Sequence, residues 1–300
     1  MVNAARTLAD NARPPARRHR SRWRSIPPAV ALFMLVVAAI ILMALLAPLV
    51  APYAPNAGTL RGRLLAPSWL PDGDPAYFLG SDEQGRDVLS RIIYGARISL
   101  TVGFAAVLVG GILGSVLGLL AGYFGRAVDE IIMTVADIQL AFPFILLAIA
   151  VLAVVRPSLT TLIIVVGISG WVTYARIARA QVLGLKEREF VMAVRSSGGN
   201  DARILFRHIL PNILSPLIVV ASLDLARTII LESTLSFLGL GVQPPTASWG
   251  SMLGSGREYI NTGQWWISTF AGLALTLTTI GVSRIGDWVR DVLDPTMRNV

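Results

Sequence analysis

Residues 188–212 read REFVMAVRSSGGNDARILFRHILPN, a polar island between two long apolar runs. The pattern predicts two short helices separated at Gly198–Gly199. A glycine there can adopt the positive φ that ends the first helix, and Asn200 or Asp201 can cap the second. Pro211 lacks an N–H and suits the first turn of the next long helix. A short helix that projects from an apolar bundle needs a partner on which to dock, and this chain offers no soluble domain to receive it.

The composition is that of a helical membrane protein. Of 300 residues, 54% are hydrophobic and 15% are charged, against about 25% charged in a typical soluble domain. Six apolar segments approach the roughly 20 residues that cross a bilayer. We therefore predict an all-α polytopic fold with six transmembrane helices, at about 29–50, 98–122, 129–155, 159–177, 211–237 and 266–283.

The distribution of arginine predicts which side of the membrane each loop occupies. The net charge is +8, and the arginines lie beside apolar segments, mainly in 1–28 and 176–207. This is the pattern of cytoplasmic loops and not that of a nucleic-acid-binding face. The predicted divisions are a cytoplasmic tail at 1–28, an extracytoplasmic loop at 51–95, a core at 96–290 with an inner loop at 184–210, an external re-entrant or interfacial segment at 239–264, and a cytoplasmic tail at 291–300.

Two patterns inside the predicted spans concern helix shape and packing. Pro143 should kink the third span, because its ring removes a backbone hydrogen bond and clashes with the preceding turn. In the second span, small residues recur every four positions and share one face, where another backbone can approach closely. They are Gly110, Gly114, Gly118 and Gly122. The neighbouring helix belongs either to this chain, which is the preferred interpretation, or to a partner.

Ionisable residues inside predicted spans are candidates for a translocation path, because such groups usually face a bundle interior or an aqueous cavity. They are Asp137, Asp224, Arg227 and Glu232. Asp137 either has a functional role or pairs with Arg176 or Arg126, and pairing is the preferred interpretation. Asp224 and Arg227 are three residues apart, so they either form an intrahelical pair or face a pore. The role of Glu232 stays open.

Several kinds of chemistry are disfavoured. The chain has no cysteine, which excludes disulfides and thiolate metal sites. The two histidines, His19 and His208, are far apart in sequence, so we expect no metal site. Lys186 is the only lysine and lies between Leu185 and Glu187, so the Gly-Lys-Ser/Thr of a phosphate-binding loop is missing. We predict that the chain is not itself an enzyme and that any ATP is hydrolysed by another chain.

The polar island resembles the coupling loop of ABC importer permeases. Ala193, Gly198, Leu210 and Pro211 fall in register with that motif, whereas Met192, Val194 and His208 depart from it. Three further stretches are similar to the C-type permeases of dipeptide, oligopeptide, glutathione and nickel importers, and the resemblance runs from about residue 26 to the C-terminus. They are GSDEQGRDVLSR at 80–91, LSFLGLGVQPP at 235–245 and GDWVRDVLDP at 286–295.

The resemblance implies a type I importer permease fold in a bacterial cytoplasmic membrane. The chain would form half of a pore with a homologous B-type permease, two ATPase subunits would bind ATP and Mg, and an external solute-binding protein would deliver di- or oligopeptides. Nickel, glutathione or another small solute is the alternative cargo. The loop residues implied to contact the ATPase are Arg188, Glu189, Phe190, Ala193, Val194, Arg195, Gly198, Leu210 and Pro211.

Two further alternatives come from the residues. The 80–91 stretch either contacts an external partner or seals the outer mouth, or it is braced locally by Asp82, Arg86 and Asp87. A transporter of another class, driven by an ion gradient, could use the four ionisable residues of the spans as a relay. Such proteins often show inverted repeats with paired broken helices, and no comparable halves are apparent in this sequence.

Overall fold

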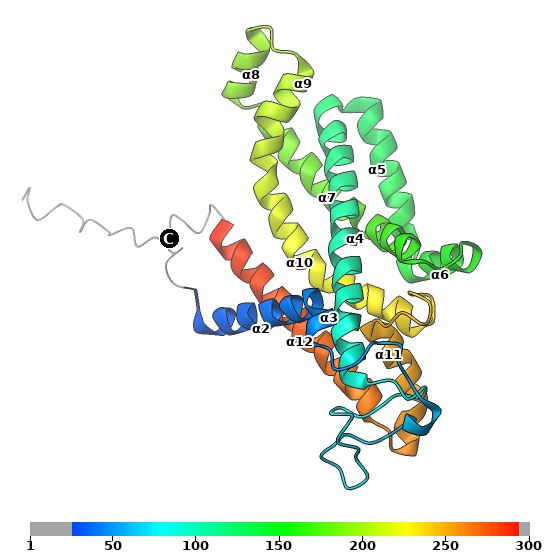
Figure 1. The fold of residues 1–300 in the computed structure, drawn as a ribbon. Helices are drawn as coiled ribbons and strands as arrows, with labels where there is room; N and C mark the ends of the chain where they lie inside the picture. Colours follow the sequence, from blue (N-terminus) through cyan, green and yellow to red (C-terminus); the bar gives the residue numbers. More distant parts are fainter. Residues whose placement is uncertain (1–25, 294–300) are drawn as a thin grey trace, which may run out of the picture.

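A computed structural model gives the fold of residues 26–293 (Figure 1). These residues form helices joined by loops, and none of them lies in a β-strand. The predicted tails at 1–28 and 291–300 fall mostly outside the described residues. The elements are α2 (Pro28–Leu45), α3 (Ala47–Val50), η2 (Leu60–Gly62), α4 (Val88–Phe124), α5 (Arg126–Ala141), α6 (Phe144–Val154), α7 (Leu159–Leu185), α8 (Glu189–Ser196), α9 (Asp201–Arg203), η3 (Ile204–Ile209), α10 (Leu210–Phe237), α11 (Trp249–Gly256), η4 (Arg257–Thr262) and α12 (Trp266–Leu293).

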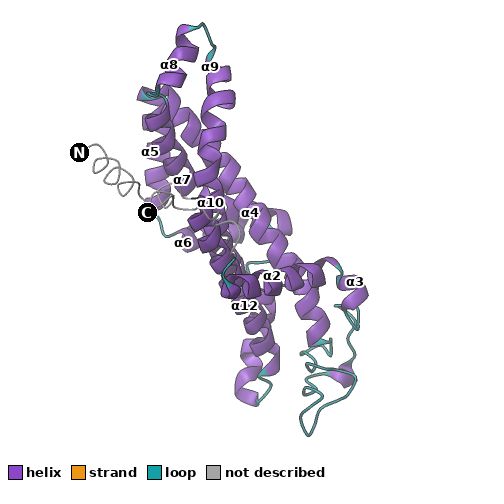
Figure 2. Ribbon diagram, turned by 90° about the vertical axis from the view of Figure 1, so that its left-hand side faces the viewer, coloured by secondary structure: helices purple, strands orange, loops and turns teal. Residues whose placement is uncertain are grey.

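Long helices form a bundle that has distinct ends. Helices α8 and α9 lie at one end, called here the α8 end, and the segment between α3 and α4 lies at the other, called the loop end (Figures 1 and 2). Five helical segments are long and apolar enough to cross a membrane, and α5 with α6 supplies a sixth if that pair is one span. Helix α4 begins at Val88, ten residues before the predicted second span, and α7 and α12 also extend beyond their predicted ends.

The third predicted span is broken, where the sequence predicted only a kink. Helices α5 and α6 meet at an angle of 89°. Phe142 adopts φ −102° and ψ 136°, and Pro143 adopts φ −58° and ψ 117°, so two consecutive residues leave the helical conformation. The residue before a proline is pushed out of the helical region by the ring, and Phe142 follows that preference fully. Helix α6 consequently lies across the bundle (Figure 1).

Pro211 lies in the first turn of α10, as the sequence predicts. The difference lies before it, because α9 passes through the π-helical η3 into α10 without a break and residues 201–237 form one helical segment. Proline cannot donate a hydrogen bond to the preceding turn, and the wider π-turn accommodates that loss. The side-chain Nδ2 of Asn212 also donates to the carbonyl of His208 at 2.6 Å. The island therefore contains one separate short helix, α8, and the extended first turns of a long one.

Helices α4 and α7 approach each other closely along the glycine face. A side chain at Gly110, Gly114 or Gly118 would collide with backbone atoms of α7, at Gly167, Trp171 and Ala175 respectively. At Gly122 the nearest atoms belong to Val182 and Arg179 of the same helix. The neighbour of the glycine face is thus a helix of this chain.

The loop end is braced from within by the 80–91 stretch. Arg86 Nε lies 2.7 Å from Asp82 Oδ2, and Arg91 Nε lies 3.2 Å from the same oxygen. Asp87 caps α4, because its Oδ2 accepts a hydrogen bond from the Ser90 N–H at 2.7 Å. Local pairing thus holds for Asp82 and Arg86, whereas Asp87 serves as a helix cap.

Candidate functional site

The turn after α8 has the geometry that its residues predict. Gly198 adopts φ +78°, and Gly199 N–H donates to the carbonyl of Val194 at 3.0 Å, which ends the helix. Asn200 Oδ1 then accepts from the Arg203 N–H at 2.8 Å and caps the next helical segment. A glycine at positive φ and an asparagine cap together reverse the chain within four residues.

Helix α8 has a buried anchor and an exposed apolar surface, and the sequence pattern did not separate them. Val191 is fully buried and belongs to an apolar cluster with Ile204 and Ile209. Phe190 and Met192 are exposed. Of the apolar residues implied to contact the ATPase, Phe190 and Ala193 are thus exposed, whereas Val194 packs against the buried cluster. Sequence reasoning missed Val191, the buried contact of α8.

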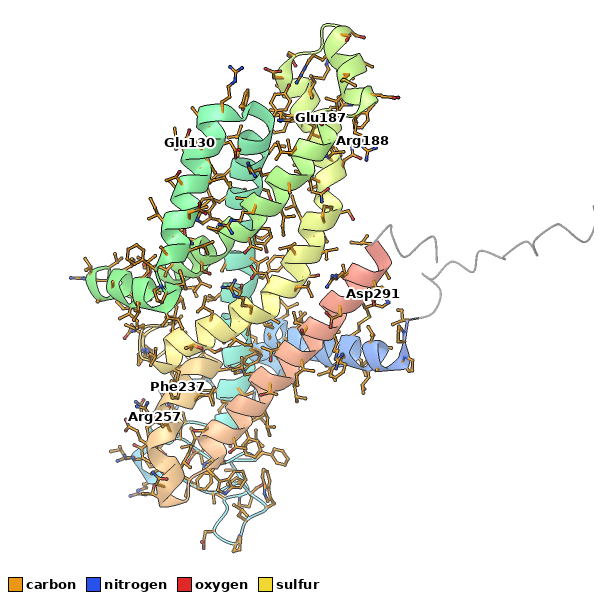
Figure 3. All side chains as sticks on the ribbon, turned by 180° about the vertical axis from the view of Figure 1, so that it is seen from behind. Glu130, Glu187, Arg188, Phe237, Arg257 and Asp291 are labelled. Atoms are coloured by element: carbon orange, nitrogen blue, oxygen red, sulfur yellow. The ribbon has the colours of Figure 1, made fainter. Side chains whose placement is uncertain are left out.

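An open groove lies beside this exposed surface. It has a volume of about 330 Å³ and lies between α8 and the π-helical turn; its lining is Ala193, Val194, Ser197, Gly199, Arg203 and His208. Glu187 and Arg188 mark the junction of α7 and α8 at the same end (Figure 3). Short apolar groups, one hydroxyl and two basic side chains form a surface suited to a protein partner with acidic and apolar groups.

Polar contacts tie the α8 end together, and the sequence did not predict them. Arg195 Nη2 donates to the Tyr123 hydroxyl at 3.2 Å, which raises the pKa of the guanidinium. The Tyr123 hydroxyl donates to Asp201 Oδ1 at 2.5 Å. Lys186 Nζ donates to the carbonyl of Gly122 at 3.1 Å. These contacts join residues more than sixty positions apart, for which a single sequence carries no signal.

Helices α5 and α7 are joined by two ion pairs. Arg179 binds Asp129 through two nitrogens. Arg176 Nη2 lies 2.6 Å from Asp137 Oδ1, and these two side chains are 50% and 67% exposed. Asp137 therefore pairs with one of the two arginines considered for it. Both charged side chains are exposed, although they lie on helices of the bundle. The surface formed there by α5 and α7 therefore faces water or another protein and not lipid.

Asp224 and Arg227 lie on α10 against α7. Arg227 Nη1 is 3.5 Å from Asp224 Oδ1, and the Tyr174 hydroxyl donates to Asp224 Oδ2 at 3.3 Å. The Asp224 side chain is 13% exposed and that of Arg227 is 61% exposed. The carboxylate is thus held against the bundle, whereas the guanidinium is exposed.

Glu232 has a different environment from the other three ionisable residues. It is fully buried, and its carboxyl accepts hydrogen bonds from Ser236 at 2.7 Å and Ser233 at 3.2 Å. Ser99 and Ser248 lie beside the carboxyl. Among the described residues, no hydrogen bond or ion pair joins Glu232 to Asp224 or Asp137, so the structure separates the four candidates into three sites.

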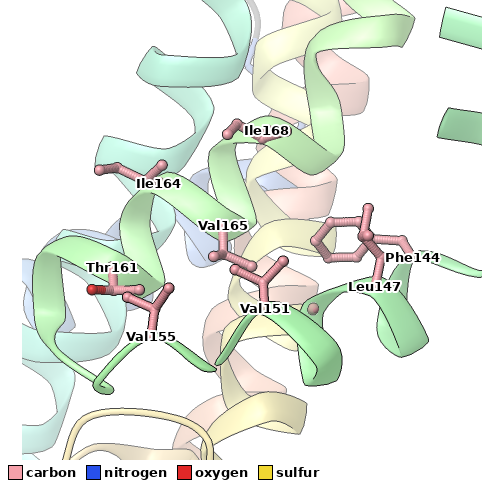
Figure 4. Close-up of a pocket in the computed structure, with 9 residues that line it drawn as sticks. Phe144, Leu147, Val151, Val155, Thr161, Ile164, Val165 and Ile168 are labelled. Carbon is pink, nitrogen blue, oxygen red and sulfur yellow. The ribbon is translucent and has the colours of Figure 1, made fainter. Parts of the chain in front are cut away.

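An apolar groove of about 290 Å³ lies between α6 and α7 (Figure 4). Phe144, Leu147 and Val151 line it from α6, and Ile164 and Ile168 line it from α7. With almost wholly aliphatic and aromatic walls, the groove suits a lipid chain or another helix, and it lacks the polar groups that would orient a charged solute.

Two family descriptions match the chain. The family described as "Binding-protein-dependent transport system inner membrane component" matches residues 114–299. The one described as "N-terminal TM domain of oligopeptide transport permease C" matches residues 17–67. The two matches together cover most of the chain and fall on the core and on the first span.

Curated relatives match nearly the full length. The "Di/tripeptide transport system permease protein DppC" of Pseudomonas aeruginosa is 43% identical over 268 residues, which cover 89% of this chain and 87% of the relative. The "Probable D,D-dipeptide transport system permease protein DdpC" of Escherichia coli is 40% identical, with 87% and 85% covered. The "Glutathione transport system permease protein GsiD" of Pectobacterium atrosepticum is 43% identical, with 75% and 74% covered.

The fold is similar to that of a solved transporter. A chain of the MetNI methionine ABC transporter, solved in inward-facing conformations, aligns with a TM-score of 0.55 at 18% identity. The alignment covers 68% of this chain and 97% of that one. This likeness concerns the arrangement of the helices.

Proposed function

This chain belongs to the family of binding-protein-dependent transport system inner membrane components and is a permease subunit of an ABC importer, and we propose that α8 couples its half of the pore to a separate ATPase subunit. The observation that carries the proposal is the exposed apolar surface of α8, with Phe190 and Met192 beside an open groove at one end of the bundle. A soluble partner would cover that surface, because apolar side chains grouped on a projecting helix favour burial.

The connections of α8 suit the transmission of motion. The turn at 186–188 joins it to the end of α7, and the turn after it leads within four residues into the helical segment 201–237. Two long helices therefore move when α8 moves. Packed helices respond to such a displacement as rigid bodies, because close-packed interfaces shift between arrangements and do not deform continuously. Closure of two ATPase subunits on ATP and Mg would tilt α7 and α10 and change which side of the pore is open.

We propose di- or oligopeptides as the cargo, with a B-type permease and an external solute-binding protein as the other partners in a bacterial inner membrane. The names of the dipeptide-transport relatives support this choice. The accessible Arg227 and the exposed Asp137–Arg176 pair supply charges of both signs for a solute that has an ammonium and a carboxylate. Nickel or glutathione remains the alternative, and identifying the solute that co-purifies with the binding protein decides between them.

The ion-gradient alternative lacks support. A proton or ion relay needs groups in contact, whereas the four ionisable residues occupy three separate sites in the described structure. Family membership also favours a machine driven by ATP.

A substitution at Gly198 tests the coupling proposal. A methyl group there would meet nothing within 4 Å in this chain, so a larger residue interferes only with a docked partner or with the turn itself, at φ +78°. In the reconstituted transporter we expect Gly198→Val to keep ATP hydrolysis and to lower uptake by about tenfold, which lies within the typical range of coupling between sites. Normal uptake would refute the assignment.

Gly263 provides the matched control. It also has open space around it and a positive φ, +94°, but it lies at the loop end. Gly263→Val introduces the same kind of backbone strain as Gly198→Val, away from the docking surface. If Gly263→Val couples normally, the loss of uptake in Gly198→Val is due to its place on the docking surface and not to strain. In an otherwise unchanged complex, a cysteine introduced by Ser196→Cys and alkylated with a maleimide that carries a benzophenone should also cross-link to the ATPase subunit on illumination, because Ser196 is exposed on α8.

A further inference from the structure

Tyr123 occupies the last turn of α4, where three elements meet. Its side chain is 9% exposed and packs in the apolar cluster that contains Val191 of α8 and Ile204 of the π-helical turn. The ring thus lies in the apolar cluster that both arms of the α8 end share, although the residue belongs to neither arm. Its position in an apolar helix gave no indication of a polar role.

The hydroxyl of Tyr123 bonds to both sides of the Gly198 turn. It accepts a hydrogen bond from Arg195, in the last turn of α8, at 3.2 Å, and donates one to Asp201, in the first turn of α9, at 2.5 Å. The Arg195 guanidinium carbon also lies 5.7 Å from the centre of the Tyr123 ring. One side chain therefore holds the two helices that the turn separates, with a charged group on each side.

The turn that follows Tyr123 connects α4 to α5. Lys186, just before α8, bonds to the carbonyl of Gly122, so a second contact joins the same turn of α4 to the loop. Gly125 then reverses the chain with φ +62° into α5, and Asp129 of α5 is paired with Arg179. A displacement that reaches Tyr123 is thus applied to both α4 and α5.

Apolar contacts alone would not fix α8 in this way. The packing of Val191 is non-directional and allows the helix to slide or rotate. Hydrogen bonds to charged groups have defined lengths and directions and are about twice as strong as neutral ones. The Tyr123 hydroxyl therefore supplies the geometric constraint between α8 and α4 that the apolar cluster lacks.

We propose that Tyr123 is a positioning residue for transport, which links α8 to α4 so that displacement of α8 by the ATPase reaches α4 and α5 as well as α7 and α10. This inference rests on the proposed coupling role of α8. It adds a third route for the motion, through a side chain and not through the main chain. Loss of the hydroxyl should leave α8 able to dock while α4 follows it poorly.

The test is Tyr123→Phe in the complete transporter, reconstituted in liposomes with its binding protein and a radiolabelled dipeptide. The ring stays in the cluster and only the hydroxyl is removed. We expect the number of peptides taken up per ATP hydrolysed to fall by roughly fivefold or more, the lower end of typical coupling between sites, with cross-linking from Ser196→Cys to the ATPase unchanged. A transport ratio equal to that of the parent overturns the proposal.

Variants of Asp201 separate positioning from a loss of folding. Asp201→Asn keeps an oxygen that can accept from Tyr123, although through a weaker, neutral hydrogen bond, so its ratio should fall less than that of Asp201→Ala, which should match Tyr123→Phe. The double variant Tyr123→Phe/Asp201→Ala should be no worse than either single one. An equal loss in Asp201→Asn and Asp201→Ala would contradict the link, and the comparison remains decisive if Tyr123→Phe does not accumulate.

The control is Tyr53→Phe, which removes a hydroxyl that donates to the Ala76 carbonyl at 3.0 Å at the loop end. It should leave the ratio unchanged. Failure of the two proposals is distinguishable. Absence of cross-linking in the complex that carries only Ser196→Cys refutes docking of α8, whereas preserved cross-linking with an unchanged ratio in Tyr123→Phe refutes only the link through Tyr123.

Discussion

Glu232 shows how a buried acid can be structural within an apolar bundle. It accepts hydrogen bonds from Ser233 and Ser236 of α10, and Ser99 of α4 and Ser248, which caps α11, lie beside it. No described basic side chain forms a salt bridge with it. A buried polar group is stable only when it is hydrogen-bonded, and here hydroxyls of α10 satisfy the carboxyl where α4 and α11 meet that helix. We infer that the carboxyl holds α4, α10 and α11 together near the loop end.

Substitution of Glu232 should distinguish hydrogen bonding from charge. Glu232→Gln keeps the shape and an oxygen acceptor, so we expect nearly normal stability. Glu232→Ala leaves buried hydroxyls without a partner, at about 1–3 kcal/mol. The midpoint of thermal unfolding in detergent should then fall by about 2–4 °C per kcal/mol for a chain of this size. Thr234→Val is the control, because its hydroxyl bonds only to the Ile230 carbonyl on an exposed face. Equal losses in the glutamine and alanine variants would show that the charge is required.

Individual residues also show what the sequence can and cannot predict. The pairing of Asp137 with Arg176 was foreseen, because a charge inside a span requires a partner and few were available. The role of Tyr123 was not foreseen, because its partners are 72 and 78 positions away. Val191 and Phe190 are neighbours of similar polarity, and the cluster formed by α4, α7 and the π-helical turn determines which one is buried.

At the scale of elements, the glycine face of α4 determines how closely α7 can approach. At Gly114 a side chain would overlap the carbonyl of Trp171. At Gly111 a methyl group would lie 3.5 Å from Tyr174 Cε1, an ordinary contact. Two glycines three positions apart on one helix therefore differ sharply in the space beside them.

We expect Gly114→Val to separate α4 from α7, at roughly 1–3 kcal/mol for overpacking, and Gly111→Ala to be nearly neutral. Fluorescence-detected size-exclusion chromatography after heating measures the fraction of each variant that stays monodisperse. A Gly114→Val protein as heat-resistant as the parent would mean that another helix, and not α7, faces the glycines in the assembled transporter.

Two prolines illustrate where prediction of elements from sequence ends. The sequence correctly placed a disturbance at Pro143 and placed Pro211 in the first turn of a long helix, because a missing N–H affects a helix in any fold. Their outcomes differ. Phe142 takes an extended conformation and the helix breaks, whereas the turn before Pro211 widens to a π-helix and continues. The choice depends on packing against distant helices, such as the burial of Ile204 and Ile209.

At the scale of the whole molecule, the two ends differ in chemistry. The α8 end carries basic side chains, among them Arg188, Arg203 and Arg207. The loop end carries an aromatic group in which Trp69 lies 5.4 Å from Phe78 and 6.0 Å from Phe270, measured between ring centres. At the same end the guanidinium of Arg257 stacks over Phe237 at 5.1 Å (Figure 3). Basic loops favour the cytoplasmic side, and aromatic clusters favour a membrane interface.

This asymmetry predicts the orientation on which the coupling proposal depends. Because the chain has no cysteine, Asp72→Cys and Ser196→Cys each introduce one exposed thiol, at the loop end and the α8 end respectively. In spheroplasts, a membrane-impermeant maleimide should label the Asp72→Cys protein at once and the Ser196→Cys protein only after the membrane is permeabilised. The unsubstituted protein controls for background labelling. Labelling of Ser196→Cys in sealed spheroplasts would place α8 outside the cell, where no ATPase subunit could reach it, and the proposed coupling would then be wrong whatever the behaviour of the Gly198 and Tyr123 variants.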